Sequence, residues 1–97
     1  MKSVKWQDCA YEDMAIGNYL GKMPNPDDPV TPGMQVCARY KDLDVHLRIT
    51  SQIQDQEGFF AATVLYFEPV GAPTPDDVKT DDEVRIDRQH ICGLYEK

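Results

Sequence analysis

The sequence predicts a mainly β protein, a single small domain in which about five antiparallel strands curl into a barrel. Apolar and polar residues alternate between Leu43 and Ile53, which is typical of a strand with one dry and one wet face. A turn sequence and a second apolar run follow directly. Four prolines crowd the preceding stretch, and a chain of 97 residues has room for only one core. A closed or nearly closed sheet would protect the strand edges of so small a protein.

The strongest signal is a hairpin between the alternating run and the apolar run Phe59–Phe67. The intervening Asp55–Gly58 suits a type I turn with a glycine at positive φ, which Gly58 adopts at little steric cost. Because Phe59–Phe67 is apolar on both faces, we expect it to be a central strand that is covered on both sides.

Three shorter strands are expected at residues 34–40, 84–86 and 91–94, where apolar residues alternate or cluster. The first of them starts directly after Pro32 and Gly33. Residues 87–90 suit one tight helical turn before the last strand.

The first 33 residues allow two interpretations. A helix capped by Asp8 would run to Leu20, with Gly17 as its weak point. Two short strands, around Val4–Trp6 and Ala15–Leu20, fit the same stretch. We therefore divide the single domain into an N-terminal segment with a proline-rich loop, residues 1–33, and a small β-barrel, residues 34–97.

The order of elements from Pro32 to Ile91 resembles an SH3-like barrel, in which a helical turn precedes the last strand. The resemblance covers about two-thirds of the chain and implies the fold alone, because it carries no diagnostic motif. An α+β roll, with one amino-terminal helix against an antiparallel sheet, is the alternative.

Charge and hydropathy limit the classes of partner. Ten Lys and Arg stand against seventeen Asp and Glu, giving a net charge of -7. A general nucleic-acid binder needs surplus Lys and Arg, and a membrane span needs about 20 consecutive apolar residues. We therefore expect a protein partner with a basic patch, and neither a nucleic-acid nor a membrane partner. The sequence leaves the oligomeric state open.

The three cysteines are Cys9, Cys37 and Cys92, so at least one of them cannot pair within the chain. No apolar stretch follows Lys2 and Lys5, and we therefore expect reduced thiols and a cytoplasmic location. The alternative, in an exported protein, is a Cys9–Cys37 or a Cys37–Cys92 bridge.

An acidic loop, residues 68–83, carries most of the acidity in the second half of the chain. Its charged residues are Glu68, Asp76, Asp77, Asp81, Asp82 and Glu83 against Lys79. We expect Asp81, Asp82 and Glu83 to steer a basic partner toward the protein. A solvated loop that prolines keep irregular is the alternative interpretation.

Aromatic residues are the candidate anchors for that partner. Because the second strand of the hairpin is apolar on both faces, a partner could cover one of them, and we expect Tyr40, Phe60 and Tyr66 to provide the apolar contacts. The alternative is that these large side chains fill the core of a small protein.

Groups able to do chemistry are present, but no motif joins them. Two cysteines and two histidines, Cys37, His46, His90 and Cys92, could form a zinc or thiol site, yet their spacing lacks a Cys-x-x-Cys pair. Asp44 and Glu68 are a possible carboxylate pair. We therefore expect neither a metal nor a cofactor nor enzymatic activity. The leading hypothesis is a non-enzymatic interaction module. The alternatives are an acidic inhibitor or immunity-type protein that mimics nucleic-acid charge, and a zinc- or thiol-dependent site.

Overall fold

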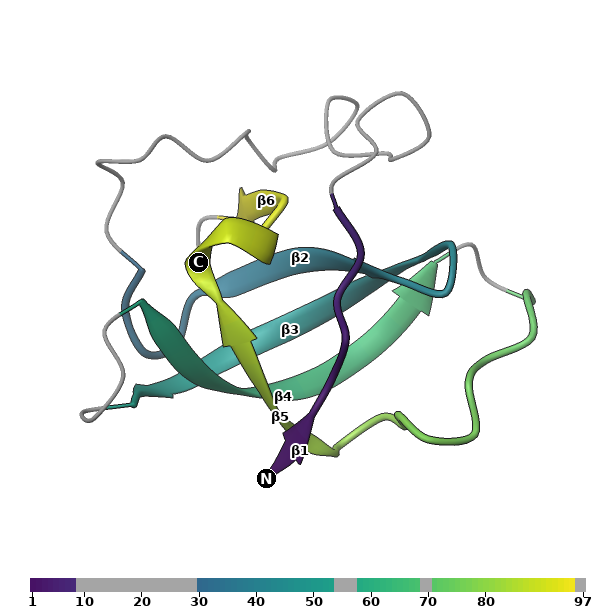
Figure 1. Cartoon of the computed structure of the whole chain (residues 1–97), viewed down its shortest axis with the longest axis horizontal. Helices are drawn as coiled ribbons and strands as arrows, with labels where there is room; N and C mark the ends of the chain where they lie inside the picture. The colour runs from purple at the N-terminus through teal and green to yellow at the C-terminus, as the bar shows by residue number, and fades with distance from the viewer. Residues whose placement is uncertain (9–29, 54–57, 69–70, 96–97) are drawn as a thin grey trace.

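The computed structural model describes residues 1–8, 30–53, 58–68 and 71–95 of the chain. Its strands form one mixed six-stranded sheet in the order β1-β5-β4-β3-β2-β6 (Figure 1). The elements are β1 (Lys2–Ser3), β2 (Gln35–Tyr40), β3 (Leu43–Gln52), β4 (Phe59–Glu68), β5 (Glu83–Asp87), the 3₁₀ turn η2 (Arg88–His90) and β6 (Gly93–Tyr95). Neighbouring strands are antiparallel except β1 and β5, which are parallel. The mainly β class is therefore confirmed.

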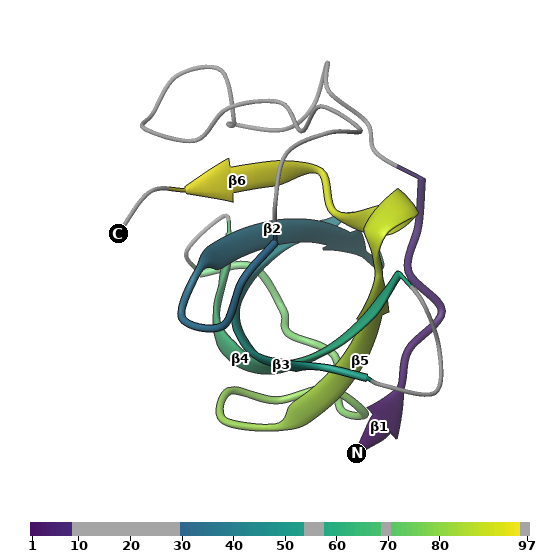
Figure 2. The same cartoon turned by 90° about the vertical axis from the view of Figure 1, so that its left-hand side faces the viewer.

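The sheet is open, with β1 and β6 at its two edges, so the expected closed SH3-like barrel is not shown. It nevertheless curls strongly, and Figure 2 views β2, β3, β4 and β5 along the axis of the curl. Residues 1–8 touch both halves of the sheet. β1 pairs with β5, while the Gln7 amide donates to the Arg39 carbonyl of β2 across 2.8 Å in an isolated bridge.

Two bulges lie in the hairpin of β3 and β4. The register skips Leu65 in β4 and Thr50 in β3. An extra residue bends its strand and increases the local right-handed twist. The bulges therefore help the two longest strands of the sheet to wrap around the core.

The predicted hairpin is confirmed, and β4 is a central strand between β3 and β5. Gly58 has a φ of +81°, as the turn prediction requires, and the Ile53 amide donates to the Phe59 carbonyl across 3.0 Å. The turn residues 54–57 lie outside the described residues. The expected strand at 34–40 and the helical turn before the last strand are present as β2 and η2.

The hydrophobic core lies on the inner face of the curl. Its fully buried side chains include Val36, Val45, Leu47, Ile49, Val64, Val84, Ile86, Ile91 and Leu94. They come from the alternate positions of β2, β3, β4 and β5 and from the C-terminal segment, which is the period of two expected for strands with one buried face.

The N-terminal segment contributes to this core through Trp6, which is 8% exposed. Its indole nitrogen donates to the Arg85 carbonyl of β5 across 2.8 Å, and its ring meets Tyr40 edge-on with centroids 5.9 Å apart. The strand lies at Lys2–Ser3 rather than at the expected Val4–Trp6. The helix or strand expected between residues 9 and 20 lies outside the described residues. No described helix is long and apolar enough to span a bilayer.

Candidate functional site

The bulge at Leu65 decides which side chains β4 presents on the outer face of the sheet. Up to Val64, every second residue faces the core. The extra residue reverses that alternation, so that Tyr66 and Glu68 point outward, with Tyr66 paired to His46 of β3. An aromatic ring and a carboxylate are thereby placed beside a histidine.

Two rows of outer-face residues cross β2, β3 and β4. One row is Arg39, Asp44 and Glu68, and the other is Cys37, His46 and Tyr66. The sequence predicts a solvated face here, and this is wrong for Asp44 and His46, which are 6% and 2% exposed. The predicted carboxylate pair of Asp44 and Glu68 is indeed brought together, since the two residues are direct cross-strand partners.

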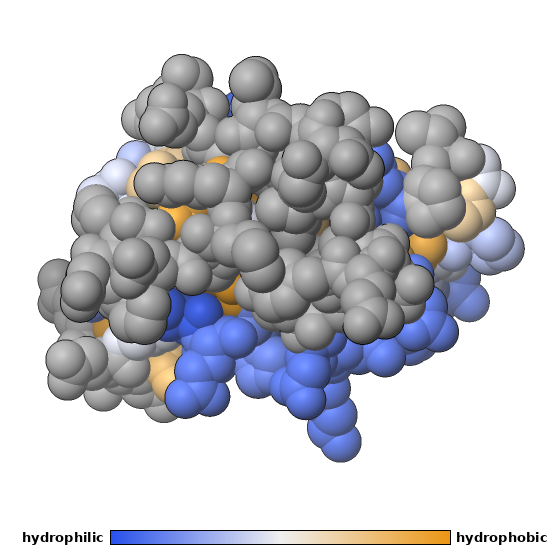
Figure 3. Space-filling view, turned by 90° about the horizontal axis from the view of Figure 1, so that it is seen from above, coloured by the Kyte–Doolittle hydropathy of each residue, from blue (hydrophilic) through white to orange (hydrophobic). Residues whose placement is uncertain are grey.

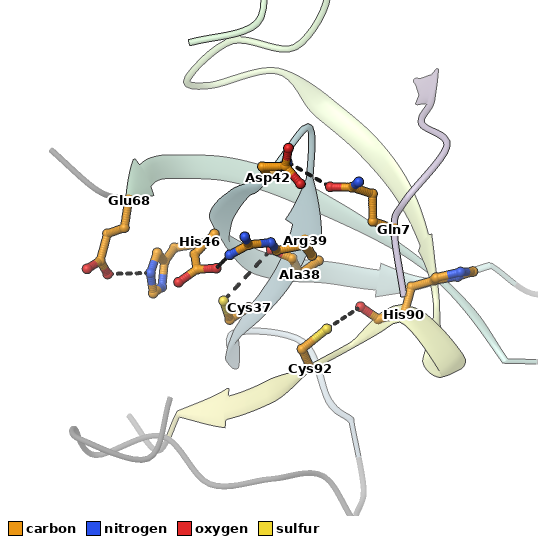
Figure 4. A network of polar contacts seen from close by, with 10 residues as sticks. Gln7, Cys37, Ala38, Arg39, Asp42, His46, Glu68, His90 and Cys92 are labelled. Carbon is orange, nitrogen blue, oxygen red and sulfur yellow. Dashed lines mark hydrogen bonds and ion pairs between the residues drawn. The ribbon is translucent and has the colours of Figure 1, made fainter. Parts of the chain in front are cut away.

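Each of these two buried polar side chains has a partner from a neighbouring strand (Figure 4). Arg39 Nη1 lies 2.8 Å from Asp44 Oδ1, with the two side chains 11% and 9% exposed. Charges withdrawn from water are tolerated only when they are paired and hydrogen-bonded. The sequence contains a signal for this pair, because Arg39 and Asp44 are placed symmetrically about a two-residue hairpin turn at Lys41 and Asp42.

His46 bridges β2 and β4. Its Nε2 lies 2.6 Å from Glu68 Oε1, and its Nδ1 lies 3.4 Å from the Gln35 side-chain amide. Burial lowers the pKa of His46, and the negative charges of Glu68 and Asp44 only partly oppose this effect. A neutral imidazole with its proton on Nε2 can accept from the Gln35 amide at Nδ1 and keeps its N–H side toward the Glu68 carboxylate.

Tyr66 stands above this buried network as an exposed ring. It is 44% exposed, and Met1 is the other exposed large hydrophobic residue in the described part of the chain. The ring stacks on the His46 imidazole, with centroids 4.2 Å apart and planes 13° apart. The Gln35 amide also reaches the Tyr66 hydroxyl, at 3.5 Å. The buried polar groups thus fix the orientation of an aromatic side chain that solvent can reach.

The acidic loop is tied to the sheet by Asp77. The Tyr40 hydroxyl donates to Asp77 Oδ2 across 2.5 Å, and Lys41 Nζ lies 3.3 Å from Oδ1. These bonds hold the pKa of Asp77 below its usual range, and the bond to the carboxylate is the main cause of a raised pKa at Tyr40. Asp77 therefore anchors the loop to the turn between β2 and β3.

Asp82 forms the second attachment of the loop. Its Oδ2 accepts from Lys2 Nζ at 2.6 Å and from the Lys79 backbone amide at 2.8 Å. These two bonds lower the pKa of Asp82. A residue expected to steer a partner is thus already engaged within the molecule, where it holds β1 against the loop.

The remaining loop carboxylates face solvent. The exposed ones without an ion pair among the described residues are Asp76, Asp81 and Glu83. The Asp81 amide donates to the Val64 carbonyl across 2.8 Å, which fixes this residue beside β4, two positions before Tyr66. Asp81 has a φ of +72°, a conformation that aspartate tolerates better than most residues. The backbone of Asp81 therefore lies against β4, two positions along the strand from the exposed Tyr66.

The other predicted anchors are placed differently. Tyr40 is 8% exposed and Phe60 is 5% exposed, and both belong to the hydrophobic core. They are buried because β2 and β4 turn these positions inward, as the alternation of each strand requires. Neither ring offers a partner more than a small edge, and Tyr66 is the predicted anchor that remains at the surface.

The cysteines and histidines do not form one site. Cys37 is a free, buried thiol whose pKa is raised, chiefly by burial, whereas Cys92 is in a disulfide. The expectation of fully reduced thiols is therefore wrong, as are both bridges that would involve Cys37. In the described part of the chain, no group of three or more His, Cys, Asp or Glu side chains is arranged to hold a metal ion.

His90 belongs to a separate contact at η2. Its Nδ1 lies 2.5 Å from Asp87 Oδ1, and the two side chains are 28% and 20% exposed. Asp8 approaches the other ring nitrogen, at 3.9 Å. The contact joins the end of β5 to the N-terminal segment. The Cys92 thiol cannot serve as a nucleophile beside His90 while it is bonded.

Comparisons with known proteins identify no relative: no protein-family model, no curated protein and no solved structure matches the chain.

Proposed function

We propose that the protein is a non-enzymatic interaction module that binds a protein partner with a basic patch. The observation that carries this proposal is the exposed Tyr66 ring on β4, against which the acidic loop is fixed through the backbone of Asp81, an exposed acidic residue. Tyrosine is enriched at protein interfaces because it combines a large apolar body with a polar tip. The carboxylates would attract a basic surface and orient it before contact.

The distribution of charge supports this proposal over a catalytic one. The buried ionisable groups of the outer face contact one another, Arg39 with Asp44 and His46 with Glu68. Such pairs orient and stabilise the surface above them.

The exposed surface also supports a partner that is recognised by charge. On the face in Figure 3, the hydrophilic side chains of the described residues gather along the lower edge of the view.

A second candidate rests on the same free carboxylates. An acidic inhibitor or immunity-type protein would present them to a nucleic-acid-binding groove as a mimic of phosphate charge. Binding by charge alone weakens steeply with added salt, whereas binding that also buries Tyr66 retains a salt-independent part. The two candidates therefore differ in their salt response.

Affinity capture from a native cell extract tests the proposal, with the captured protein then purified and titrated directly. We expect Asp81→Asn to weaken binding, because it removes an exposed charge and keeps the side-chain shape. Asp8→Asn is the matched control, since it also removes one exposed negative charge, in this case beside His90 of η2. Equal retention by wild type, Asp81→Asn and Tyr66→Leu proteins would contradict the proposed surface.

The cytoplasmic location expected from the sequence remains a prediction. The disulfide at Cys92 counts against it, because cytosolic reductants keep most thiols reduced. Three reduced thiols in the purified protein would support the cytoplasmic location, and a disulfide at Cys92 would contradict it.

A further inference from the structure

The second face of the Tyr66 ring is open. His46 of β3 covers one face, in a nearly parallel stack. On the opposite side of β4, among the described residues, the pairing with β5 ends at Thr63 and Glu83, and the loop bonds only to Val64 beyond it. No described strand therefore continues beside Tyr66 on that side, and its 44% exposure is consistent with a ring accessible from there.

One carboxylate lies on the same face of β4 as Tyr66, and a second belongs to the loop that adjoins β4. Glu68 lies two residues further along β4, on the same outer face, with its Oε1 engaged by His46 and its side chain 27% exposed. Asp81 is fixed beside Val64 by its backbone amide and carries an exposed, unpaired side chain. An incoming cation that stacked on Tyr66 would meet the negative charge of Glu68 on the same face of β4, and the loop that carries Asp81 adjoins β4 on the open side.

The flat ring and the carboxylates together match a guanidinium group better than an ammonium group. A guanidinium is planar, stacks on aromatic rings and presents paired N–H donors to a carboxylate, whereas an ammonium is a compact and strongly hydrated point charge. The same chemistry already occurs in this molecule, where the guanidinium of Arg85 lies over the Phe59 ring, 4.3 Å from its centroid.

We propose that the open face of Tyr66, with Glu68 and Asp81 beside it, is a site for an arginine side chain of the protein partner. The inference rests on the proposed function, and it adds the residue that the partner must present. The guanidinium would extend the stack of His46 and Tyr66 by a third planar group. It would donate hydrogen bonds to the free oxygen of Glu68 or to Asp81.

Two fluorescein-labelled peptides of equal charge, (Gly-Arg)₄ and (Gly-Lys)₄, test this site by fluorescence anisotropy. We expect wild-type protein to bind the arginine peptide about 3- to 5-fold more tightly than the lysine peptide. Tyr66→Leu should remove that preference, and Tyr66→Phe should keep it, because phenylalanine retains the aromatic face. Asp81→Asn should weaken binding of both peptides, with Asp8→Asn as the control of equal charge.

A second measurement requires no variant. Stacking on Tyr66 places the arginine side chain in the shielding region of the ring, so its δ-methylene protons should shift upfield in NMR spectra when wild-type protein is added. Equal affinity for the two peptides, or the absence of that shift, would overturn the arginine site and leave the broader proposal standing. Failure of both peptides to bind at low salt would overturn the proposed function as well.

Discussion

The Tyr66 ring lies flat on the His46 imidazole, with 4.2 Å between the ring centroids. One of these rings is 44% exposed and the other is 2% exposed, so a surface aromatic group rests directly on a buried titratable one. The protonation state of His46 is thus linked to the surface through which we propose the protein binds.

Stability should depend on pH through His46. Burial lowers the pKa of His46 in the folded state below the value of about 6.5 in the unfolded chain. Between these two values the unfolded state binds more protons, so the free energy of unfolding should fall as the pH drops below about 6.5. The contribution of His46 is fully present above that pH. Urea denaturation at a series of pH values measures this slope.

NMR titration of the imidazole gives the control. In a His90→Gln protein the remaining histidine signal belongs to His46, and its titration midpoint should lie below pH 6.5. A midpoint at or above pH 6.5 would contradict the lowered pKa.

Removing one partner of the buried ion pair of Arg39 and Asp44 should destabilise the folded protein strongly. Asp44→Leu leaves a guanidinium without its carboxylate and should lower the free energy of unfolding by about 3–5 kcal/mol. The double variant Arg39→Met, Asp44→Leu removes both charges and should recover most of that loss. Urea denaturation of both single variants and the double variant completes the cycle, and additive losses would show that the two side chains are not coupled.

A substitution in the two-residue turn between β2 and β3 should increase the stability of the protein. Lys41 and Asp42 have φ values of 48° and 63°, a conformation typical of a type I′ turn, which favours Asn followed by Gly. Asp42→Gly alone, which leaves the contact of Lys41 with Asp77 in place, should therefore raise the free energy of unfolding by about 1 kcal/mol. Thermal unfolding checks the direction. The Gln7 contact is made to the backbone amide of Asp42 and survives the exchange, so an unchanged or lower Tm would argue against strain at this turn.

The number of free thiols should depend on the presence of reductant, and the Cys37 thiol should be unreactive in the folded protein. Burial raises the pKa of the Cys37 thiol, so it should resist alkylation in the folded protein at neutral pH. Because Cys92 is in a disulfide, the unfolded chain should titrate one thiol without reductant and three with it. Three thiols without reductant would instead support a reduced protein and the cytoplasmic location.

The sequence predicts the backbone of this fold better than its outer surface. Strict alternation in Leu43–Ile53 and the glycine at 58 are local signals, and the hairpin follows from them. The burial of His46 cannot be predicted from neighbouring residues, because its partner Glu68 is twenty-two positions away and reaches the same face only in the folded sheet. The bulge at Leu65 reverses which side chains of β4 face the core. Because the surrounding residues are mostly apolar, no pattern in the sequence reveals this reversal. Phe60 and Tyr66 therefore look equivalent in the sequence, although one is in the core and the other is exposed.

The N-terminal contribution is also non-local. Trp6 is separated from its hydrogen-bond acceptor Arg85 by most of the chain, and nothing in the first residues indicates that contact. The placement of the acidic loop is similar, because Asp77 and Asp82 are held by Tyr40 and Lys2, which are distant in sequence. Contacts of this kind require the tertiary arrangement, and a pattern within one segment cannot reveal them.

The single unpaired residue at Leu65 also constrains how this protein can diverge. Removing or adding one residue between Phe59 and Tyr66 would exchange the inside and the outside of the rest of β4, moving a core-filling ring into water and the surface tyrosine into the protein. Homologous chains are therefore expected to vary in β4 by substitution at constant length. Changes of length should instead accumulate in the acidic loop, where the chain can absorb them without reversing a face.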